Sequence, residues 1–168
     1  MNGSGEQVIV VDADNRPRGN ASRSRMREEG LTYRATYILV CNPGGEILLQ
    51  QRSAGKDMYP GYYDAVAGGV VQAAESYEDS AARELEEELG IAGVPMERLF
   101  DFYFEDPDNR VWGRAYRCLH DGPLRLQAEE IDAAFFCPIE RVLEGDFLPL
   151  TPDSHYALRC YHSQLSYR

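Results

Sequence analysis

The sequence is poor in basic residues and has almost no lysine. Lys56 is the only lysine among 168 residues, and 17 basic residues stand against 28 acidic ones, for a formal net charge of −11. A surface this acidic repels polyanions, which argues against a nucleic-acid polymer or an anionic membrane as partner. The remaining basic residues are arginines, which favour planar, two-pronged contacts with carboxylate or phosphate groups. A small anionic substrate stays compatible with this composition where arginines or bound metal ions offset the negative field.

Paired cysteines and long apolar runs are also missing. The cysteines lie far apart and form no CxxC pair: Cys41, Cys118, Cys137 and Cys160. This spacing fits neither a zinc knuckle nor a disulfide-rich secreted domain, so we expect reduced cysteines packed as small apolar residues. No apolar run approaches the ~20 residues of a membrane span, and the first residues lack the basic and apolar regions of a signal peptide. We therefore expect a cytoplasmic protein.

What is present is an alternation of β-rich runs with amphipathic segments. We predict strands at 7–12, 33–41, 46–52, 65–72, 98–105, 110–119 and 132–138, and helices at 22–30, 76–89 and about 152–166. Strands on both sides of a strong central helix predict a mixed β-sheet with helices on its faces, an α/β or α+β sandwich. We expect one domain over 1–168, with an N-terminal β-hairpin region at about 7–30. The C-terminal helix shows no chemical signature.

The central helix carries four glutamates within "RELEEELG", residues 83–90. At ~100° per residue, Glu84, Glu87 and Glu88 share one face beside the apolar stripe, while Glu86 points to solvent. Arg83 lies four residues before Glu87, within reach of an ion pair.

Two interpretations of this acidic face are open. It is either a solvated surface or a site for a cation. Like charges one helical turn apart repel, and this face adjoins the buried stripe, so we favour a cation such as Mg²⁺ or Mn²⁺, which take oxygen ligands. The pair Gly68–Gly69 just upstream either permits a bend or brings a backbone carbonyl to the same ion.

Read from residue 69, "GVVQAAESYEDSAARELEEELGI" resembles the Nudix box, G-x5-E-x7-R-E-U-x-E-E-x-G-U, where U is aliphatic. Every fixed position is filled: Gly69, Glu75, Arg83, Glu84, Leu85, Glu87, Glu88, Gly90 and Ile91. A pattern of this length is far more specific than an ordinary short motif. The resemblance spans 69–91, and the flanking pattern fits the α/β/α sandwich of that family over most of the chain.

The resemblance implies hydrolysis of a nucleoside diphosphate linked to another group. By position, Glu84, Glu87 and Glu88 would be catalytic ligands of Mg²⁺ or Mn²⁺, with the carbonyl of Gly68 as a further ligand. Clustered divalent ions neutralise a diphosphate and acidify the attacking water. The general base stays open between Glu87 or Glu88 on the helix and a late-loop residue, for which we take Glu130, with its neighbour Glu129 as an alternative.

A finer resemblance links the chain to the isopentenyl-diphosphate isomerase branch of this superfamily. It is carried by "GKDMYPGYYDAVAGGVVQ" and the N-terminal "VIVVDADNRPRG". The nucleophilic cysteine of those isomerases is matched by Ala67, a metal-binding histidine by Gly69, and their later acidic groups by "RVWGR". Isomerase activity is therefore disfavoured, and an isomerase-like Nudix hydrolase is the better match. A non-catalytic ligand-sensing module is a third alternative, against which the intact glutamates argue.

Substrate contacts are expected outside the box. In the resembling family, cations at the positions of Arg52 and Lys56 contact the diphosphate. Aromatic residues, among them Tyr63 and Trp112, could stack on a nucleobase, although aromatics near turns more often pack in the core. Because many relatives pair, a homodimer is a possible assembly.

Overall fold

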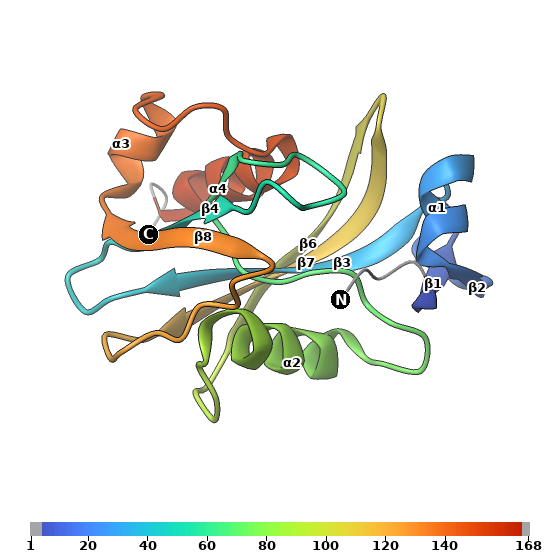
Figure 1. The fold of residues 1–168 in the computed structure, drawn as a ribbon, viewed down its shortest axis with the longest axis horizontal. Coiled ribbons are helices and arrows are strands. Elements are labelled where there is room, and N and C mark those ends of the chain that lie inside the picture. The colour runs from blue at the N-terminus through green and yellow to red at the C-terminus, as the bar shows by residue number, and fades with distance from the viewer. Residues whose placement is uncertain (1–4, 166–168) are drawn as a thin grey trace.

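A computed structural model describes residues 5–165. In chain order the elements are β1 (Gln7–Val11), β2 (Pro17–Ser22), α1 (Arg23–Glu29), β3 (Tyr33–Cys41), β4 (Ile47–Arg52), β5 (Tyr63–Asp64), α2 (Tyr77–Leu89), β6 (Glu97–Asp106), β7 (Asn109–Leu119), β8 (Ile131–Cys137), α3 (Ile139–Leu143) and α4 (Pro152–Leu165). The strands form one mixed sheet, and the helices cover its faces (Figure 1). This confirms the predicted mixed α+β architecture.

Strand β3 organises the sheet. It runs parallel to β7 over its whole length, from the pair Tyr33–Val111 to the pair Cys41–Leu119, and β7 forms a hairpin with β6. Strand β4 pairs instead with β8 and β5. The strands β3 and β4 meet only at Cys41 and Ile47, so the sheet opens between them into two wings. The space between the wings is available for a site.

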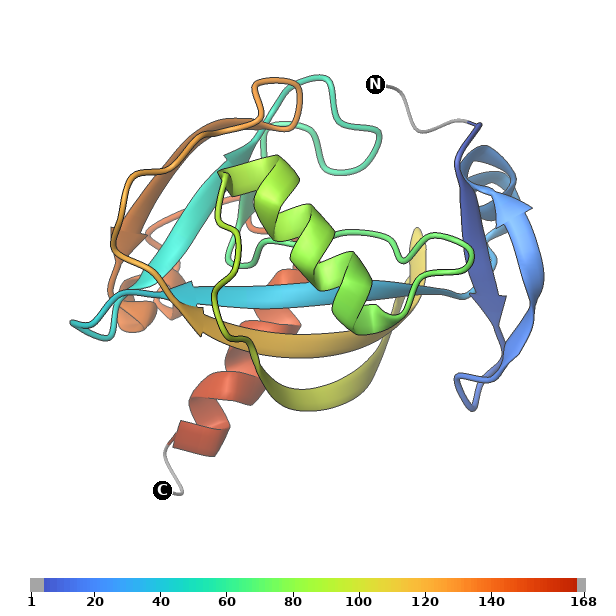
Figure 2. The same ribbon diagram turned by 90° about the horizontal axis from the view of Figure 1, so that it is seen from below.

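Two apolar layers form on the two faces of β3, because its side chains alternate. Tyr37 and Leu39 belong to the core cluster that includes residues of α4, whereas Ile38 and Val40 belong to the cluster that includes Leu85 of α2. All four β3 side chains are at most 4% exposed. In Figures 1 and 2 the helices α2 and α4 accordingly lie on opposite sides of the sheet, an α/β/α arrangement.

The helix α2 begins and ends as the sequence predicts. The side chain of Ser76 caps it by accepting a hydrogen bond from the Asp79 N–H at 3.0 Å. Gly90 ends it in the left-handed conformation, at φ 70°, where glycine is favoured. The short helix α1 has the same plan, with Ser22 as N-cap and Gly30 as a left-handed C-cap. Both helix predictions are confirmed.

The predicted strand at 65–72 is wrong as a continuous strand. The segment makes isolated bridges instead, at Ala67 with Ile38, at Val70 with Ala35 and at Gln72 with Val8. The reason is the glycine pair: Gly68 has φ 130°, which turns the backbone out of the regular strand. The helix α3 was not predicted, since its five residues are too few for a helical periodicity to show.

The N-terminal hairpin prediction is confirmed by the antiparallel pairing of β1 with β2. The C-terminal helix runs from Pro152 to Leu165, and residue 166 of the predicted range lies outside the described residues. Within 5–165, no helix is both long enough and apolar enough to cross a membrane.

Candidate active site

The helix α2 divides its glutamates between a buried and an exposed side. Glu88 is only 9% exposed although it carries a carboxylate, and the Glu84 side chain is 15% exposed. Glu86 is exposed, as predicted, and half of the Glu87 side chain is exposed. The apolar residues Leu85 and Leu89 fix this rotation by packing under β3. The acidic face is therefore partly buried and is not a fully solvated surface.

Glu88 is held in an environment that opposes its charge. Burial raises the pKa of its carboxyl group well above the ordinary value, and the neighbouring Glu84 raises it further. Lys56 acts in the opposite direction, more weakly. No ion pair links Glu88 to a basic side chain within the described part of the chain. A carboxylate in this position gains stability from a cation or a proton.

The glycine pair makes room for this helix. A Cβ atom at Gly69 would lie 2.7 Å from Glu84 Oε1, and one at Gly68 would lie 2.2 Å from the Thr36 carbonyl oxygen. The Gly69 carbonyl accepts the Thr36 N–H at 2.9 Å, so this segment is tied to β3. Only glycine lets the backbone approach both the glutamate and the strand this closely.

A small cavity opens beside the helix, between the two wings of the sheet. It is lined by Gln50, Arg52, Lys56, Asp64, Gly68, Glu88, Glu130 and Ile131. Five of the site residues predicted from the sequence therefore meet in one place, two of them basic and two acidic. The amide nitrogen of Gln50 is buried here and has no hydrogen-bond partner within residues 5–165. A buried donor without a partner is costly unless a ligand or water satisfies it.

Ion pairs connect the acids and bases of this cavity. Lys56, from the loop after β4, pairs with Glu130, from the loop before β8. Arg52 lies 3.2 Å from Asp64 Oδ2 and donates two further hydrogen bonds to the Met58 carbonyl. The two basic side chains predicted to contact a diphosphate are thus held at the cavity by protein oxygens.

Arg83 pairs with Glu87 at 3.2 Å, as predicted, but its shorter contacts are elsewhere. Two of its nitrogens bind the Glu75 carboxylate, at 2.7 and 3.0 Å, and a third contact reaches Glu84 Oε1 at 3.0 Å. The hydrogen bond to Glu75 is the largest influence that raises the pKa of Arg83. Arg83 therefore positions three carboxylates.

The side chains are not arranged as a closed metal site. No three carboxylate, histidine or cysteine side chains of residues 5–165 converge on one point that could hold a metal ion. Glu87 is turned toward Arg83, on the outer side of the helix. The paired carboxylates Glu84 and Glu88 and the closely approached backbone at Gly68 fit a hard divalent cation in the chemistry of their oxygens, whereas Glu87 would first have to leave Arg83.

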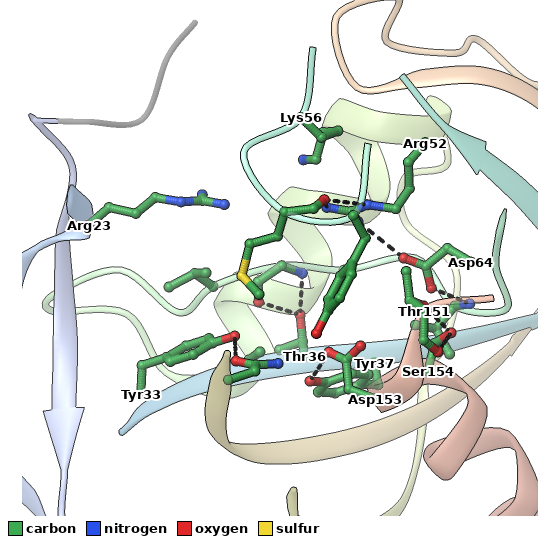
Figure 3. Close-up of a pocket in the computed structure, with 18 of the residues that line it drawn as sticks. Arg23, Tyr33, Thr36, Tyr37, Arg52, Lys56, Asp64, Thr151, Asp153 and Ser154 are labelled. Carbon is green, nitrogen blue, oxygen red and sulfur yellow. Dashed lines mark hydrogen bonds and ion pairs between the residues drawn. The ribbon is translucent and has the colours of Figure 1, made fainter. Parts of the chain in front are cut away.

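A larger cavity lies beside the small one, and Figure 3 shows residues that line it. Arg52, Lys56, Asp64 and Gly68 line both cavities and mark their junction. Beyond that junction the large cavity reaches side chains of α1, β3 and α4.

The structure does not bring Tyr63 and Trp112 to either cavity within the described residues. Tyr63 packs against Phe147 at 5.7 Å between ring centroids, and Trp112 packs against Tyr103 at 5.5 Å. Both side chains therefore pack against other aromatic residues and do not take the expected place beside a nucleobase. Tyr59 lines the large cavity in their place.

Comparison with known proteins decides the family. The model of the NUDIX domain matches residues 31–159. The chain belongs to the Nudix family. An uncharacterized Nudix hydrolase of Pseudomonas aeruginosa is 49% identical over 93% of this chain and 93% of its own length. The uncharacterized Nudix hydrolase YfcD of Escherichia coli K12 is 47% identical over 92% of this chain and 86% of its own. These relatives confirm the predicted class of enzyme, a Nudix hydrolase.

Solved structures agree on the Nudix fold. The crystal structure of DR0079 from Deinococcus radiodurans has a TM-score of 0.79 at 22% identity and covers 92% of this chain and 98% of that chain. The NUDIX domain of NrtR from Shewanella oneidensis, solved with ADP ribose, has a TM-score of 0.66 at 18% identity over 80% of this chain and 88% of that chain. At these identities the likeness concerns the fold alone.

Sequence reasoning missed several residues that line the larger cavity of this Nudix protein. Arg23 and Arg27, one turn apart on α1, reach it from outside the matched domain, and both contact Asp57. Their four-residue spacing in the helix predicted at 22–30 could have indicated that the two side chains lie on one face. Tyr37 and Asp153 also line it, and nothing in the sequence pairs a β3 tyrosine with the first turn of the last helix.

Proposed function

We propose that this protein is a divalent-metal-dependent pyrophosphohydrolase that cleaves the diphosphate of a nucleoside diphosphate linked to another group, or a related organic diphosphate. The observation that supports this most is the buried Glu88 beside Glu84, facing a cavity that also contains Arg52 and Lys56. Acidic groups that need a cation and basic groups that suit a phosphate line the same small space. This combination serves a metal-bound diphosphate better than a neutral ligand.

Glu84, Glu88 and the carbonyl of Gly68 would hold the Mg²⁺ or Mn²⁺ ion, and Glu87 would join them after its release from Arg83. When bound, the ion offsets the charge of the diphosphate and lowers the pKa of a water molecule. Until then Arg83, fixed by Glu75, contacts both Glu84 and Glu87 and offsets the repulsion between their carboxylates.

Arg52 and Lys56 would bind the diphosphate. Both line the junction of the two cavities, so a diphosphate held there places one end toward the glutamates and its organic part in the larger cavity. Lys56 must then turn from Glu130 toward the substrate, which frees the Glu130 carboxylate.

Glu130 would accept the proton of the attacking water. Glu130 lines the small cavity with Glu88, whereas the neighbouring Glu129 is exposed. The backbone carbonyl of Glu129 accepts a hydrogen bond from the Ser53 hydroxyl at 2.7 Å. A base must lie within hydrogen-bond reach of the proton it abstracts, so position favours Glu130 over Glu129. Glu87 and Glu88 are better used as ligands in this scheme.

The isomerase alternative gains no support. Ala67, at the position of the isomerase nucleophile, is 1% exposed, and its N–H and carbonyl are bonded to Ile38. Within residues 5–165, no cysteine lines either cavity. The isomerase-like branch, the cytoplasmic location, the homodimer and the single domain over 1–168 stay predictions from the sequence.

A hydrolysis panel tests the proposal. Nucleoside di- and triphosphates, nucleotide sugars, dinucleotides and prenyl diphosphates are incubated with Mg²⁺, with Mn²⁺ or with EDTA, and the products are separated by chromatography. We expect cleavage at a diphosphate in at least one class, supported by metal and stopped by EDTA. Tight nucleotide binding without turnover under every metal condition would favour the sensing module instead.

A further inference from the structure

The first turn of α4 forms part of the wall of the large cavity. Thr151, Asp153 and Ser154 line it there. Thr151 and Ser154 are each 1% exposed and hydrogen bonded to one another, and Ser154 Oγ also accepts the Ala65 N–H at 3.3 Å. Their polar atoms are therefore used to attach the helix to the sheet. Asp153 is the charged group that this turn contributes to the cavity.

Asp153 lies among tyrosines. The Tyr37 hydroxyl donates a hydrogen bond to Asp153 Oδ2 at 2.8 Å, and the side chains of Tyr33 and Tyr59 line the same cavity. Figure 3 shows the contact between Tyr37 and Asp153. Burial, then the nearby Asp64, raises the pKa of the Asp153 carboxyl group. A carboxyl group surrounded by phenol rings is a setting that suits an amine or ammonium group.

The neighbouring acid differs from Asp153 in one respect. Asp64 is paired with Arg52 at 3.2 Å, whereas no arginine, lysine or histidine of the described residues forms an ion pair with Asp153. Asp153 is thus a partly buried carboxyl group without an ion pair, to which the Tyr37 hydroxyl donates a hydrogen bond and on which Arg52 acts only as a nearby charge. A ligand group that donates hydrogen bonds would supply a second partner for this carboxyl group, beside Tyr37.

The cavity has two chemically different ends. In Figure 3, Arg23, Lys56 and Arg52 lie along its upper side, and Asp153 lies at the bottom with Tyr37. Glu88 and Glu130 line the small cavity, which does not include Asp153. A substrate with its diphosphate at Arg52 and Lys56 therefore extends its organic part toward Asp153.

We propose that Asp153 is a specificity residue that binds an amino group on the organic part of the substrate. The inference rests on the proposed function, because it takes the diphosphate to be held at the junction of the two cavities. The amino group donates a hydrogen bond to the carboxylate of Asp153, and a carbonyl oxygen in the same place is repelled. The chemistry is shared by an aliphatic ammonium group and by the exocyclic amine of a nucleobase.

Two matched ligand pairs test the proposal and separate these sources. Cytidine 5′-diphosphate and uridine 5′-diphosphate differ by an exocyclic amine against a carbonyl, and 3-aminopropyl diphosphate and 3-hydroxypropyl diphosphate differ by an ammonium group against a hydroxyl. Affinities are measured by calorimetry with Ca²⁺ present, and chromatography after each titration checks that the ligand is intact. The proteins are the wild type, Asp153→Asn and, as control, Asp121→Asn, whose side chain is exposed and lines neither cavity.

We expect the wild type and Asp121→Asn to bind the amino member of one pair about tenfold more tightly, the value of one hydrogen bond to a charged group. Asp153→Asn should remove most of this preference while both members still bind. The pair that shows the preference identifies the source of the amino group.

Equal affinity of the wild type within both pairs overturns the inference and leaves the proposed function standing, as does an undiminished preference in Asp153→Asn. Binding of neither member of either pair also overturns the inference, and the hydrolysis panel then decides the proposed function separately. Should Asp153→Asn not fold, Tyr37→Phe replaces it. It removes the donor that competes for the carboxylate, so the preference should increase, and an unchanged or reduced preference overturns the inference.

Discussion

The guanidinium of Arg83 binds the carboxylate of Glu75 through two hydrogen bonds, at 2.7 and 3.0 Å. The contact joins helix α2 to the loop that precedes it, eight residues earlier. The same guanidinium also touches Glu84 and Glu87. One basic side chain thus contacts three carboxylates at the acidic face and needs no metal ion to do so.

Glu75→Gln should lower the free energy of unfolding by about 1 kcal/mol at neutral pH, the scale of a partly exposed, charge-assisted hydrogen bond. Burial acts to raise the pKa of Glu75, but hydrogen bonds from Arg83 and from the Gln72 N–H outweigh it, and the net pKa is lowered from 4.5. A lowered pKa in the folded state stabilises the protein above the unfolded pKa, and this stabilisation is lost as the pH falls through the folded value. Urea unfolding at several pH values should show the two proteins converging below about pH 4. A difference that does not depend on pH would contradict this role.

The glycine pair gives a matched comparison. Gly68→Ala places a Cβ atom 2.2 Å from a backbone oxygen at φ 130°, so it should lower the free energy of unfolding by about 2 kcal/mol or more. Gly69→Ala meets only the movable end of Glu84, at 2.7 Å. It should cost less stability and instead weaken metal binding by displacing that carboxylate.

Thermal unfolding and Mn²⁺ titration measure the two effects. Equal losses of stability in the two variants, or an unchanged Mn²⁺ affinity in Gly69→Ala, would contradict the interpretation of this segment.

Glu130→Gln and Glu129→Gln separate the two candidates for the general base. With a substrate found in the hydrolysis panel, Glu130→Gln should lower kcat by about 100-fold or more while KM changes little. Glu129→Gln should leave both constants within about twofold of the wild type, since its side chain is exposed and outside the cavity. The reverse pattern, or similar effects of both changes, would reject Glu130 as the base.

Much of the fold follows from local signals. The capped helix α2, the strand β3 and the adjacent strands β6 and β7 were all predictable, because each depends on neighbours in the sequence. The strand expected at 65–72 failed, because the conformation of Gly68 is set by its close approach to Thr36, a residue of another strand.

In the candidate site, too, features set by sequence neighbours were predictable and features set by distant residues were not. Glu84 and Glu88 could be predicted because helical periodicity places them on one face. The burial of Glu88 in a cavity with Glu130 and Lys56 could not, because it depends on how β4 and β8 separate from β3. Asp153 escaped prediction for the same reason: its partner Tyr37 is 116 residues away in the sequence.

Aromatic residues were the least predictable. Tyr63 and Trp112 were expected at the substrate and pack against Phe147 and Tyr103 instead. A tyrosine in a sequence shows only that it can pack or stack, and the sheet decides which of these it does.

The central claim is that the buried carboxylates of α2 hold a divalent cation, and calorimetric titration with Mn²⁺ tests it most directly. The wild type is compared with Glu88→Gln and with Glu86→Gln, which removes a charge from the exposed side of the same helix. The account predicts nearly equal Mn²⁺ affinity for the wild type and Glu86→Gln, and an affinity at least about tenfold lower for Glu88→Gln. Equal affinity in all three proteins, or no Mn²⁺ binding by the wild type, would contradict it.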